Sequence, residues 1–317
     1  MISFFKRSKS TDHKHNNIDD QITVNAFFDD HYFPHAQATK RITIHDWSIY
    51  NKHMRPSLGR YLMCDLTNPV LDIWVREQLL AGYQRSTINK HIHLMNRMLH
   101  LARHWGHIAA QNPFQHNLKK LSVGDYTQRF LSEAEIEQLL KACRASRHPY
   151  LYLIVQLLLL TGARKGEARL ACWKHVDLHK RLWTVPRSKN GRSRRIVLSS
   201  AAVDVLHAVR VKSEDLLLPT KPDDYLFINP ITRTAYHSYD TAWFKTRAEA
   251  GLDNVRMHDL RHTYASLLIN KGVSLYEVQT LLGHSSLQMT QRYAHLEPDL
   301  LHKRTELLSN LISKSRI

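Results

Sequence analysis

Apolar residues recur at helical spacing over much of the first third of the chain. Leu71, Trp74 and Val75 lie on one such stretch, and a longer series follows at Ile88, Ile92, Met95, Leu99 and Ala102. Because three-to-four spacing places side chains on one face of a helix, it predicts a small all-helical domain over residues 22–115. Ser86 and Thr87 are candidate N-caps of the longer helix, and Gly106 is a stop signal.

The remaining two thirds combine helical and strand patterns. A capping box, Ser132-x-x-Glu135, predicts a helix start, and the run YLYLIVQLLLL over residues 150–160 predicts a buried core helix. This run is too short to span a bilayer, which needs about 20 apolar residues. Strand-like runs at 181–185 and 194–198 flank Asn190-Gly191, a strong hairpin signal.

Three further helices are expected toward the C-terminus. The first runs from about Asp259 to Lys271, and the second follows a capping box, Ser274-x-x-Glu277, and stops at Gly283. A third is expected to begin around residues 285–286. The fold class is therefore predicted to be mainly α with a small β-sheet.

Composition and charge favour a globular protein with a polyanionic partner. The chain has 317 residues, enough for about two domains, and a formal net charge of +17. The net charge is −1 over residues 1–30, +8 over 31–120 and +10 over 121–317. Two separately basic segments favour nucleic-acid binding, although solvated surface lysines are an alternative explanation. Three cysteines without metal-binding spacing and no secretory signal predict a cytoplasmic protein with no membrane segment. If its partner is DNA, the protein is expected to be nucleoid-associated.

Changes in pattern along the chain predict five parts. Residues 1–21 are polar and aperiodic and are expected to be flexible. The helical domain over 22–115 is followed by a polar linker over 116–129 and a larger domain over 130–297. Residues 298–317 carry an apolar stripe and are predicted to form a C-terminal helix.

Several polar residues in the larger domain stand at positions suited to chemistry. Arg164 and Glu167 follow the core helix, Lys189 lies at the hairpin tip, and His258 and Arg261 share a face at a helix start. His284 follows a helix-ending glycine, and Tyr293 lies a few turns further on. Taken singly, each of these residues has a more ordinary structural explanation.

In this order, the motifs resemble the tyrosine recombinase (phage-type integrase) family. The matching segments are Thr161-Gly-Ala-Arg164-Lys-Gly-Glu167, Ser-Lys189-Asn-Gly, His258-Asp-Leu-Arg261-His262, Leu281-Leu-Gly-His284 and Thr290-Gln-Arg-Tyr293-Ala-His. The resemblance runs from about Phe130 to Leu296. Over residues 22–115 it is weaker, and there it implies a core-site DNA-binding domain.

The resemblance implies a catalytic α+β domain that cleaves and rejoins DNA through a 3′-phosphotyrosyl intermediate. Tyr293 would be the nucleophile and Lys189 the general acid, while the phosphate would be stabilised by Arg164, His258, Arg261 and His284. Glu167 would help to position the catalytic residues without contacting the phosphate itself. A covalent tyrosyl link conserves the energy of the phosphodiester, so no ATP is needed, and two arginines make a metal unnecessary. We therefore expect no cofactor and no metal.

The resemblance also implies double-stranded DNA as partner, embraced by two domains. Candidate phosphate contacts lie on the basic helix and around the hairpin: Arg85, Lys90, Arg97, Arg187, Arg192, Arg194 and Arg195. A homotetramer on two DNA sites is expected, and accessory DNA-bending proteins are compatible with it. The C-terminal helix would dock either in a neighbouring subunit or within its own.

Three functions remain open at this point. The first is the integrase of a phage or other mobile element. The second is a Xer-like resolvase of chromosome or plasmid dimers, which would share the same catalytic set. The third is a catalytically silent DNA-binding regulator, against which the intact tyrosine and arginines argue.

Overall fold

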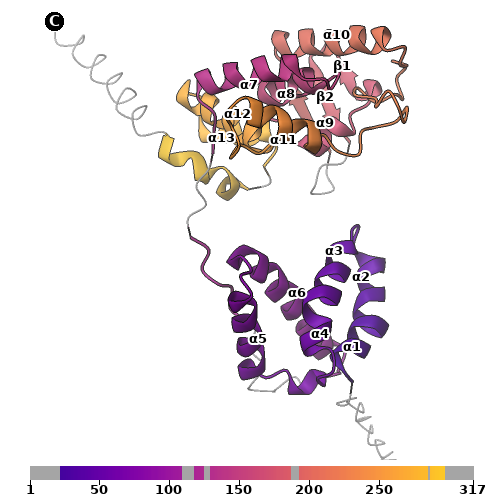
Figure 1. Cartoon of the computed structure of the whole chain (residues 1–317), viewed down its shortest axis with the longest axis vertical. Helices are drawn as coiled ribbons and strands as arrows, with labels where there is room; N and C mark the ends of the chain where they lie inside the picture. Colours follow the sequence, from indigo (N-terminus) through magenta and orange to yellow (C-terminus); the bar gives the residue numbers. More distant parts are fainter. Residues whose placement is uncertain (1–21, 109–117, 125–128, 187–192, 285, 297–317) are drawn as a thin grey trace, which may run out of the picture. The chain divides into compact units, whose positions relative to one another are not determined.

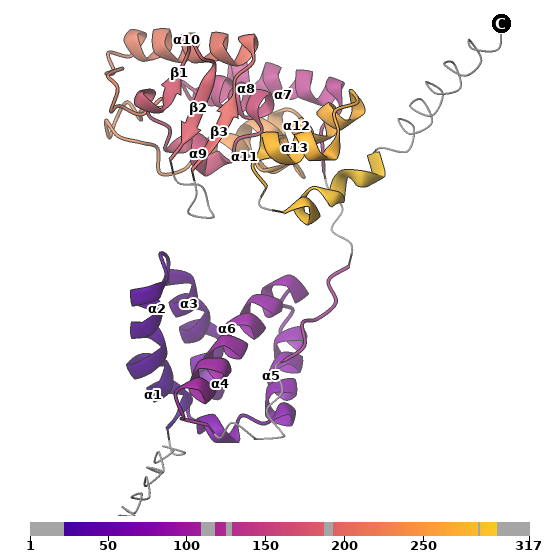
Figure 2. The ribbon, with the colours of Figure 1, turned by 180° about the vertical axis from the view of Figure 1, so that it is seen from behind.

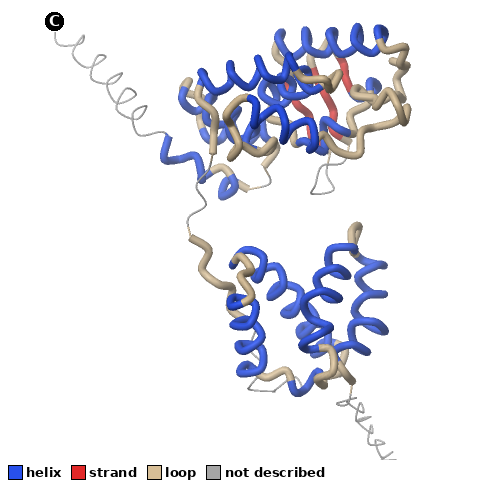
Figure 3. Tube along the Cα trace, viewed as in Figure 1, coloured by secondary structure: helices blue, strands red, loops and turns tan. Residues whose placement is uncertain are grey.

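Two compact units make up the chain, residues 1–126 and 127–317. The computed structural model describes residues 22–108, 118–124, 129–186, 193–284 and 286–296. Both units are rich in helix, and the strands lie in the second unit alone within the described residues (Figure 3). The predicted fold class, mainly α with a small β-sheet, is confirmed.

The first unit is built from helices around one apolar core (Figure 1). Its longest helix, α6, buries an apolar stripe that includes Ile88, Ile92 and Met95, as the periodicity predicted. Several short helices join end to end through wider π-helical turns. The elements are α1 (Val24–Ala26), η1 (Phe27–Tyr32), α2 (Phe33–Thr39), α3 (Ile44–Ile49), η2 (Tyr50–Met54), α4 (Arg55–Leu58), η3 (Met63–Asp65), α5 (Asn68–Leu80) and α6 (Arg85–His104).

The start of α6 differs from the prediction. The helix begins at Arg85 with Gln84 as its N-cap, so Ser86 and Thr87 fall within the first turn and no side chain caps the helix. The predicted stop is confirmed, because the helix ends at His104 with Trp105 as its C-cap, and Gly106 has a positive φ of 81°.

Part of the predicted linker is bound to the first unit. The backbone N–H of Leu118 donates to the Asn96 side chain, and the N–H of Leu121 donates to that of Asn89. The carbonyls of Leu118 and Leu121 accept bonds from the same two amides. These paired bonds hold residues 118–121 against α6.

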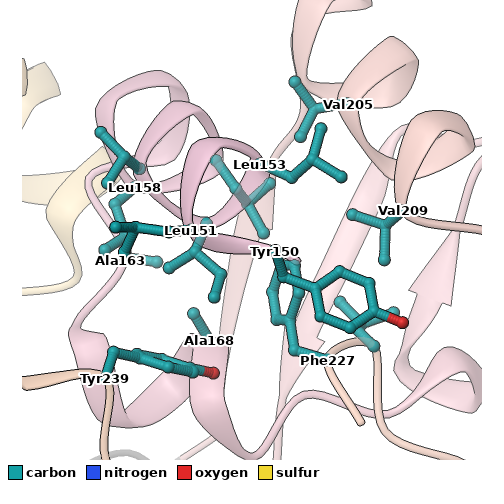
Figure 4. Close-up of a cluster of buried hydrophobic side chains, with 14 of the residues drawn as sticks. Tyr150, Leu151, Leu153, Leu158, Ala163, Ala168, Val205, Val209, Phe227 and Tyr239 are labelled. Atoms are coloured by element: carbon teal, nitrogen blue, oxygen red, sulfur yellow. The ribbon is translucent and has the colours of Figure 1, made fainter. Parts of the chain in front are cut away.

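The second unit surrounds one apolar helix. Helix α8 is hydrophobic on almost every side and contacts α7, α10 and α12, as expected of a fully buried helix. Figure 4 shows Tyr150, Leu151, Leu153 and Leu158 at this helix packed among side chains of neighbouring elements. The helices are α7 (Glu133–Ala145), α8 (Leu151–Thr161), α9 (Lys165–Arg169), η4 (Trp173–His175), α10 (Ser200–Asp215), α11 (Asp240–Glu249), α12 (Asp259–Asn270), α13 (Leu275–Leu282), η5 (Leu287–Met289) and η6 (Gln291–Leu296).

A three-stranded antiparallel sheet with the order β1-β2-β3 belongs to this unit (Figure 2). Its strands are β1 (Val176–Asp177), β2 (Leu182–Val185) and β3 (Arg194–Val197). Trp183 pairs with Ile196 in the register, and both side chains are buried. The predicted hairpin strands are confirmed, while its Asn190-Gly191 tip lies outside the described residues.

Local signals placed most helices of the second unit correctly. The capping boxes at Ser132 and Ser274 are both formed, and Gly283 ends α13 in the left-handed conformation. The single helix expected from residues 285–286 is instead two short 3-10 segments, η5 and η6. The predicted C-terminal helix at 298–317 and the N-terminal residues 1–21 lie outside the described residues. In the part of the chain that is described, no helix has the length and apolar character needed to cross a membrane.

Candidate active site

Five of the residues selected from the sequence line one cavity of the second unit. The cavity has a volume of about 690 Å³. The five residues are supplied by α9, α12 and the segments around α13 and η6: Arg164, His258, Arg261, His284 and Tyr293. Residues up to 129 positions apart in the sequence thus face a single space, which Arg256 and Arg292 also line.

Glu167 holds two arginines, of which Arg164 lines this cavity. Arg164 caps α9, and its backbone N–H and side chain donate to Glu167 at 2.8 and 2.9 Å. Arg194 on β3 donates to the same carboxylate through Nε at 3.1 Å and Nη2 at 2.6 Å. Burial acts to raise the pKa of Glu167, but hydrogen bonds and charge from Arg194, followed by those of Arg164, hold it below its ordinary value.

Arg194 does not have the role expected of it. It was predicted to contact DNA phosphates, but only 8% of its side chain is exposed. Besides the bonds to Glu167, its Nη1 donates to the Leu282 carbonyl at 2.9 Å. A Cβ on Gly283 would come within 2.8 Å of Arg194 Cδ, so glycine allows this close passage. Arg194 therefore ties β3 to α9 and to the end of α13, and unlike Arg261 it is not among the residues that line the cavity.

Arg261 is the most buried cation of the site, with 3% exposure. Its Nη1 donates to the Gly162 carbonyl at 2.6 Å and its Nη2 to the Leu282 carbonyl at 2.7 Å. Burial, followed by the charges of Arg164 and Arg194, lowers the pKa of Arg261 to about 9, so the group is positive at neutral pH. Two backbone carbonyls thus fix the direction of the guanidinium.

We expect Gly162→Ala to lower the free energy of unfolding by about 2–4 kcal/mol. Gly162 ends α8 with φ +59°, and an added Cβ would lie 2.5 Å from the Tyr264 ring. Left-handed backbone and overpacking each cost a non-glycine residue roughly 1–3 kcal/mol. Urea denaturation measures the change. Gly166→Ala is the control, since its Cβ would meet nothing within 4 Å, and an equal loss in both variants would contradict the prediction.

The two histidines selected from the sequence are both held as neutral rings. Burial, and then the positive charge of Arg261, lowers the pKa of His258. The same two causes, with Arg164 next, lower the pKa of His284 to about 3. His284 Nδ1 lies 2.8 Å from Thr290 Oγ1, which orients the ring. Neutral imidazoles beside two guanidinium groups are hydrogen-bond partners suited to a bound anion.

Tyr293 lines the cavity but is almost inaccessible to solvent, with 2% exposure. Its hydroxyl lies 2.6 Å from His262 Nδ1. Burial raises the pKa of Tyr293 to about 12, although Arg292 and Arg261 act in the opposite direction. At neutral pH the phenol is therefore protonated and needs an acceptor for its proton before it can act as a nucleophile.

His262 is a site residue to which sequence reasoning assigned no role. It was seen only as the last residue of the motif at 258–262. A usable signal existed, because residues 258 and 262 are four apart and share one helix face. In α12 their rings meet edge-on, with centroids 5.1 Å apart.

Three selected residues lie outside the described part of the chain: Lys189, Arg187 and Arg192. The other proposed phosphate contacts, Arg194 aside, differ in how far they are exposed to solvent. Arg85, Lys90 and Arg195 are exposed, and Arg97 is half-buried. Arg85 also donates to the Ser122 carbonyl at 3.0 Å. Over the described ranges, no group of three or more His, Cys, Asp or Glu residues is placed to hold a metal ion.

Comparison with known proteins extends over most of the chain. The family model described as "Phage integrase family" matches residues 129–299. The integrase of Salmonella phage P22 is 30% identical over 197 residues, which cover 59% of this chain and 49% of that protein. The tyrosine recombinase XerC of Bacillus licheniformis is 32% identical over 251 residues, covering 75% of this chain and 80% of that protein.

The fold is shared with solved structures as well. The Tn1549 transposon integrase, solved with a circular intermediate DNA, superimposes with a TM-score of 0.71 at 20% identity, covering 90% of this chain and 99% of that one. The chain spans about half the length of the first curated relatives it matches. With more than half of its residues matched by the family model and with its motifs gathered in one cavity, the chain belongs to the phage integrase family.

Proposed function

We propose that this chain is a site-specific DNA recombinase, the integrase of a phage or another mobile element. It would cleave and rejoin duplex DNA through a 3′-phosphotyrosyl intermediate. One observation carries the proposal: a phenol, two arginines and two neutral histidines from distant segments line the same cavity. Phosphoryl transfer without a metal needs such a set, because charge on the nonbridging oxygens must be neutralised by fixed donors.

In the proposed reaction, the Tyr293 oxygen attacks the scissile phosphorus and the bond to the 5′ oxygen breaks. Arg164 and Arg261 would each donate to nonbridging oxygens in a two-pronged manner that lysine does not reproduce. Their directions are already set, Arg164 by Glu167 and Arg261 by two carbonyls. Such preorganisation avoids reorientation when charge develops in the transition state.

His258, His284 and Lys189 complete the proposed mechanism. The two histidines would add hydrogen bonds to the phosphate, where loss of one donor typically costs about 100–1,000-fold in rate. Lys189 would donate a proton to the departing 5′ oxygen. The 5′ hydroxyl of a partner strand then attacks the phosphotyrosine and gives its proton to the neutral Lys189 amine. The Tyr293 oxygen leaves, so the number of phosphodiester bonds is conserved.

Relatives support DNA as the partner. The Tn1549 integrase was solved in complex with DNA, and so was a dimer of lambda integrase on a core site. We propose that residues 22–115 form the core-site DNA-binding domain and residues 130–297 the catalytic domain. Assembly as a homotetramer on two DNA sites belongs to the same proposal.

A Xer-like dimer resolvase is the second candidate. The observation favouring it is the match to XerC of Bacillus licheniformis, which spans a larger share of both proteins than the match to the phage P22 integrase. The genomic position separates the two, since phage genes or a tRNA gene beside the coding region would support the integrase.

Covalent capture of DNA tests the proposed chemistry. Short duplexes with a nick and a randomised segment would be incubated with the protein, because a nick near the cleaved bond releases the leaving strand and traps the adduct. The expected result is a protein–DNA band that survives denaturation and that enriches a defined sequence over repeated rounds. Binding without any adduct would favour a DNA-binding regulator.

DNA binding is expected to weaken by about 10³–10⁵-fold between 50 and 200 mM salt. Each phosphate contact releases counterions, and six to ten contacts give a loss of this size. Fluorescence anisotropy with the duplex that the covalent-capture experiment enriches measures how DNA affinity depends on salt concentration.

In the same assay, Lys90→Ala should reduce the slope of log K against log salt by about one. Lys180→Ala, an exposed residue outside the cavity lining, is the control. A response to salt that is nearly flat would contradict the assignment of the basic surface to DNA.

A further inference from the structure

The nucleophile of the proposed reaction has a specific partner inside the protein. His262 lies on α12, directly after Arg261, and is buried with 5% exposure. Its Nδ1 is 2.6 Å from the Tyr293 hydroxyl oxygen, and the two rings lie 5.9 Å apart at 51°. Because successive helix residues point about 100° apart, Arg261 reaches the carbonyls of Gly162 and Leu282 while His262 faces η6.

The direction of this hydrogen bond follows from burial. Tyr293 is 2% exposed, and within the described residues His262 Nδ1 is the partner recorded for its hydroxyl. If Nδ1 carried the ring proton, the phenol proton would be buried without an acceptor, at a cost that proteins rarely tolerate. The phenol therefore donates and Nδ1 accepts, which places the proton of the neutral imidazole on Nε2.

We propose that His262 is the general base of the reaction and accepts the Tyr293 proton during cleavage. This inference rests on the proposed function. As the bond from the Tyr293 oxygen to phosphorus forms, the phenol proton moves to His262 Nδ1, and the bond to the 5′ oxygen breaks. In rejoining, the 5′ hydroxyl attacks, the phenolate leaves, and His262 returns the proton to it.

The surroundings of His262 are consistent with this role. The groups facing it are His258 and Asp259 on its own helix, Arg256 before the helix, and Arg292 and Tyr293 on η6. Burial, and then His258, lowers the pKa of His262 to about 4, so the ring is an unprotonated acceptor at neutral pH. Since this value lies far below that of the phenol, the proton must move as the new bond forms rather than beforehand.

The other histidines of the cavity are engaged elsewhere. His284 Nδ1 bonds to Thr290 Oγ1, and the contact recorded for the His258 ring is with the edge of His262. Neither is recorded on the Tyr293 oxygen. Both are therefore available to bind the phosphate, and His262 has a separate task that their proposed roles do not cover.

Replacement of His262 by asparagine tests the role in proton transfer. The Asn amide can still accept or donate a hydrogen bond near the position of Nδ1 but cannot take up a proton. With the captured nicked duplex at pH 7, we expect His262→Asn to form the covalent adduct about 100–1,000-fold more slowly, with unchanged DNA affinity. His207→Asn, an exposed histidine on α10, should match the wild type.

The pH profile distinguishes a base from a merely structural residue. Wild-type adduct formation should vary little between pH 6.5 and 8.5, whereas His262→Asn should accelerate by about tenfold per pH unit because hydroxide must then remove the proton. An equal loss at every pH, or a wild-type rate in His262→Asn, would overturn the proposal.

A measurement without DNA separates failure of this inference from failure of the proposed function. In protein with ¹⁵N-labelled histidine, the His262 signal, assigned by its loss in His262→Asn, should show Nδ1 without a proton at pH 7. This signal should shift in Tyr293→Phe. A protonated Nδ1 would overturn the inference even if adducts form, whereas absence of adducts in the wild type would refute the recombinase proposal itself.

Discussion

Replacing Tyr293 with phenylalanine is expected to abolish the covalent DNA adduct while DNA binding persists. The change removes a single oxygen and keeps the ring, which is packed among Ala265, Ile269, Val278 and Leu282. Removing the nucleophile of a covalent mechanism costs at least about 10⁴-fold in rate. Denaturing gels of the captured nicked duplex measure the adduct, and fluorescence anisotropy measures the affinity.

The matched control for this experiment is Tyr276→Phe. Tyr276 lies on α13 in the same unit, but its side chain is exposed, so the rate of adduct formation should equal that of the wild type. Tyr293→Phe also leaves His262 without its partner, which lowers the free energy of unfolding by about 1–3 kcal/mol. An adduct formed by Tyr293→Phe at an undiminished rate would show that another group is the nucleophile.

Glu167→Ala is expected to lower the free energy of unfolding by about 3–5 kcal/mol. The carboxylate is buried and is shared by Arg164 and Arg194. Breaking a buried ion pair by removing one partner is costly because it leaves an uncompensated charge in the interior. Arg164 would also lose the group that orients it, so adduct formation should fall with stability. Urea denaturation at pH 7 measures the effect.

The stability contributed by Glu167 should depend on pH in a defined direction. Its folded-state pKa is below the ordinary value of 4.5, so the unfolded chain takes up a proton first as the pH falls. The contribution is therefore complete above about pH 5 and is lost as the pH drops through the lower folded-state value. The difference in stability between the wild type and Glu167→Ala should narrow below pH 4.5.

An exposed ion pair is the control for Glu167. Asp223→Asn removes the partner of Lys174 on the surface of the same unit, where solvent screens the charges and no measurable change in stability is expected. If both variants lost the same stability, the effect would not come from burial of the carboxylate.

The two largest expected effects concern different levels of the same site. Tyr293 is the proposed nucleophile. Glu167 does not line the cavity, but it accepts hydrogen bonds from Arg164 and so determines where that side chain points. Arg261 needs no such carboxylate because backbone carbonyls at Gly162 and Leu282 direct it. The ends of α8 and α13 are therefore part of the active site, although their glycines and leucines take no part in the reaction.

Much of the fold could be predicted because its signals are local. The capping boxes at Ser132 and Ser274 and the stop at Gly283 involve residues within four positions of one another. The apolar run at 150–160 identified α8 as the buried centre of the second unit. The order of the motifs identified five residues that the structure places around one cavity, while Lys189 lies outside the described residues.

Predictions were weaker where a signal depended on competition between neighbouring residues. Ser86 and Thr87 are good N-caps by residue type, but α6 already begins at Arg85, with Gln84 as an extended N-cap before it. The region after Gly283 has helical composition, yet the chain there forms short 3-10 turns. In this conformation, Thr290 meets His284 and Tyr293 enters the cavity.

The sequence by itself determined the family, the order of the elements and the candidate reactive residues, because these follow from motifs and from spacing along the chain. Only the tertiary structure decided where individual side chains point. Arg194 turns inward because Glu167 and the Leu282 carbonyl, 27 and 88 positions away, satisfy its buried charge. His262 reaches the nucleophile because α12 packs against a turn that starts 29 residues later. Such contacts have no local signal, since residues far apart in the chain meet only after the core has formed.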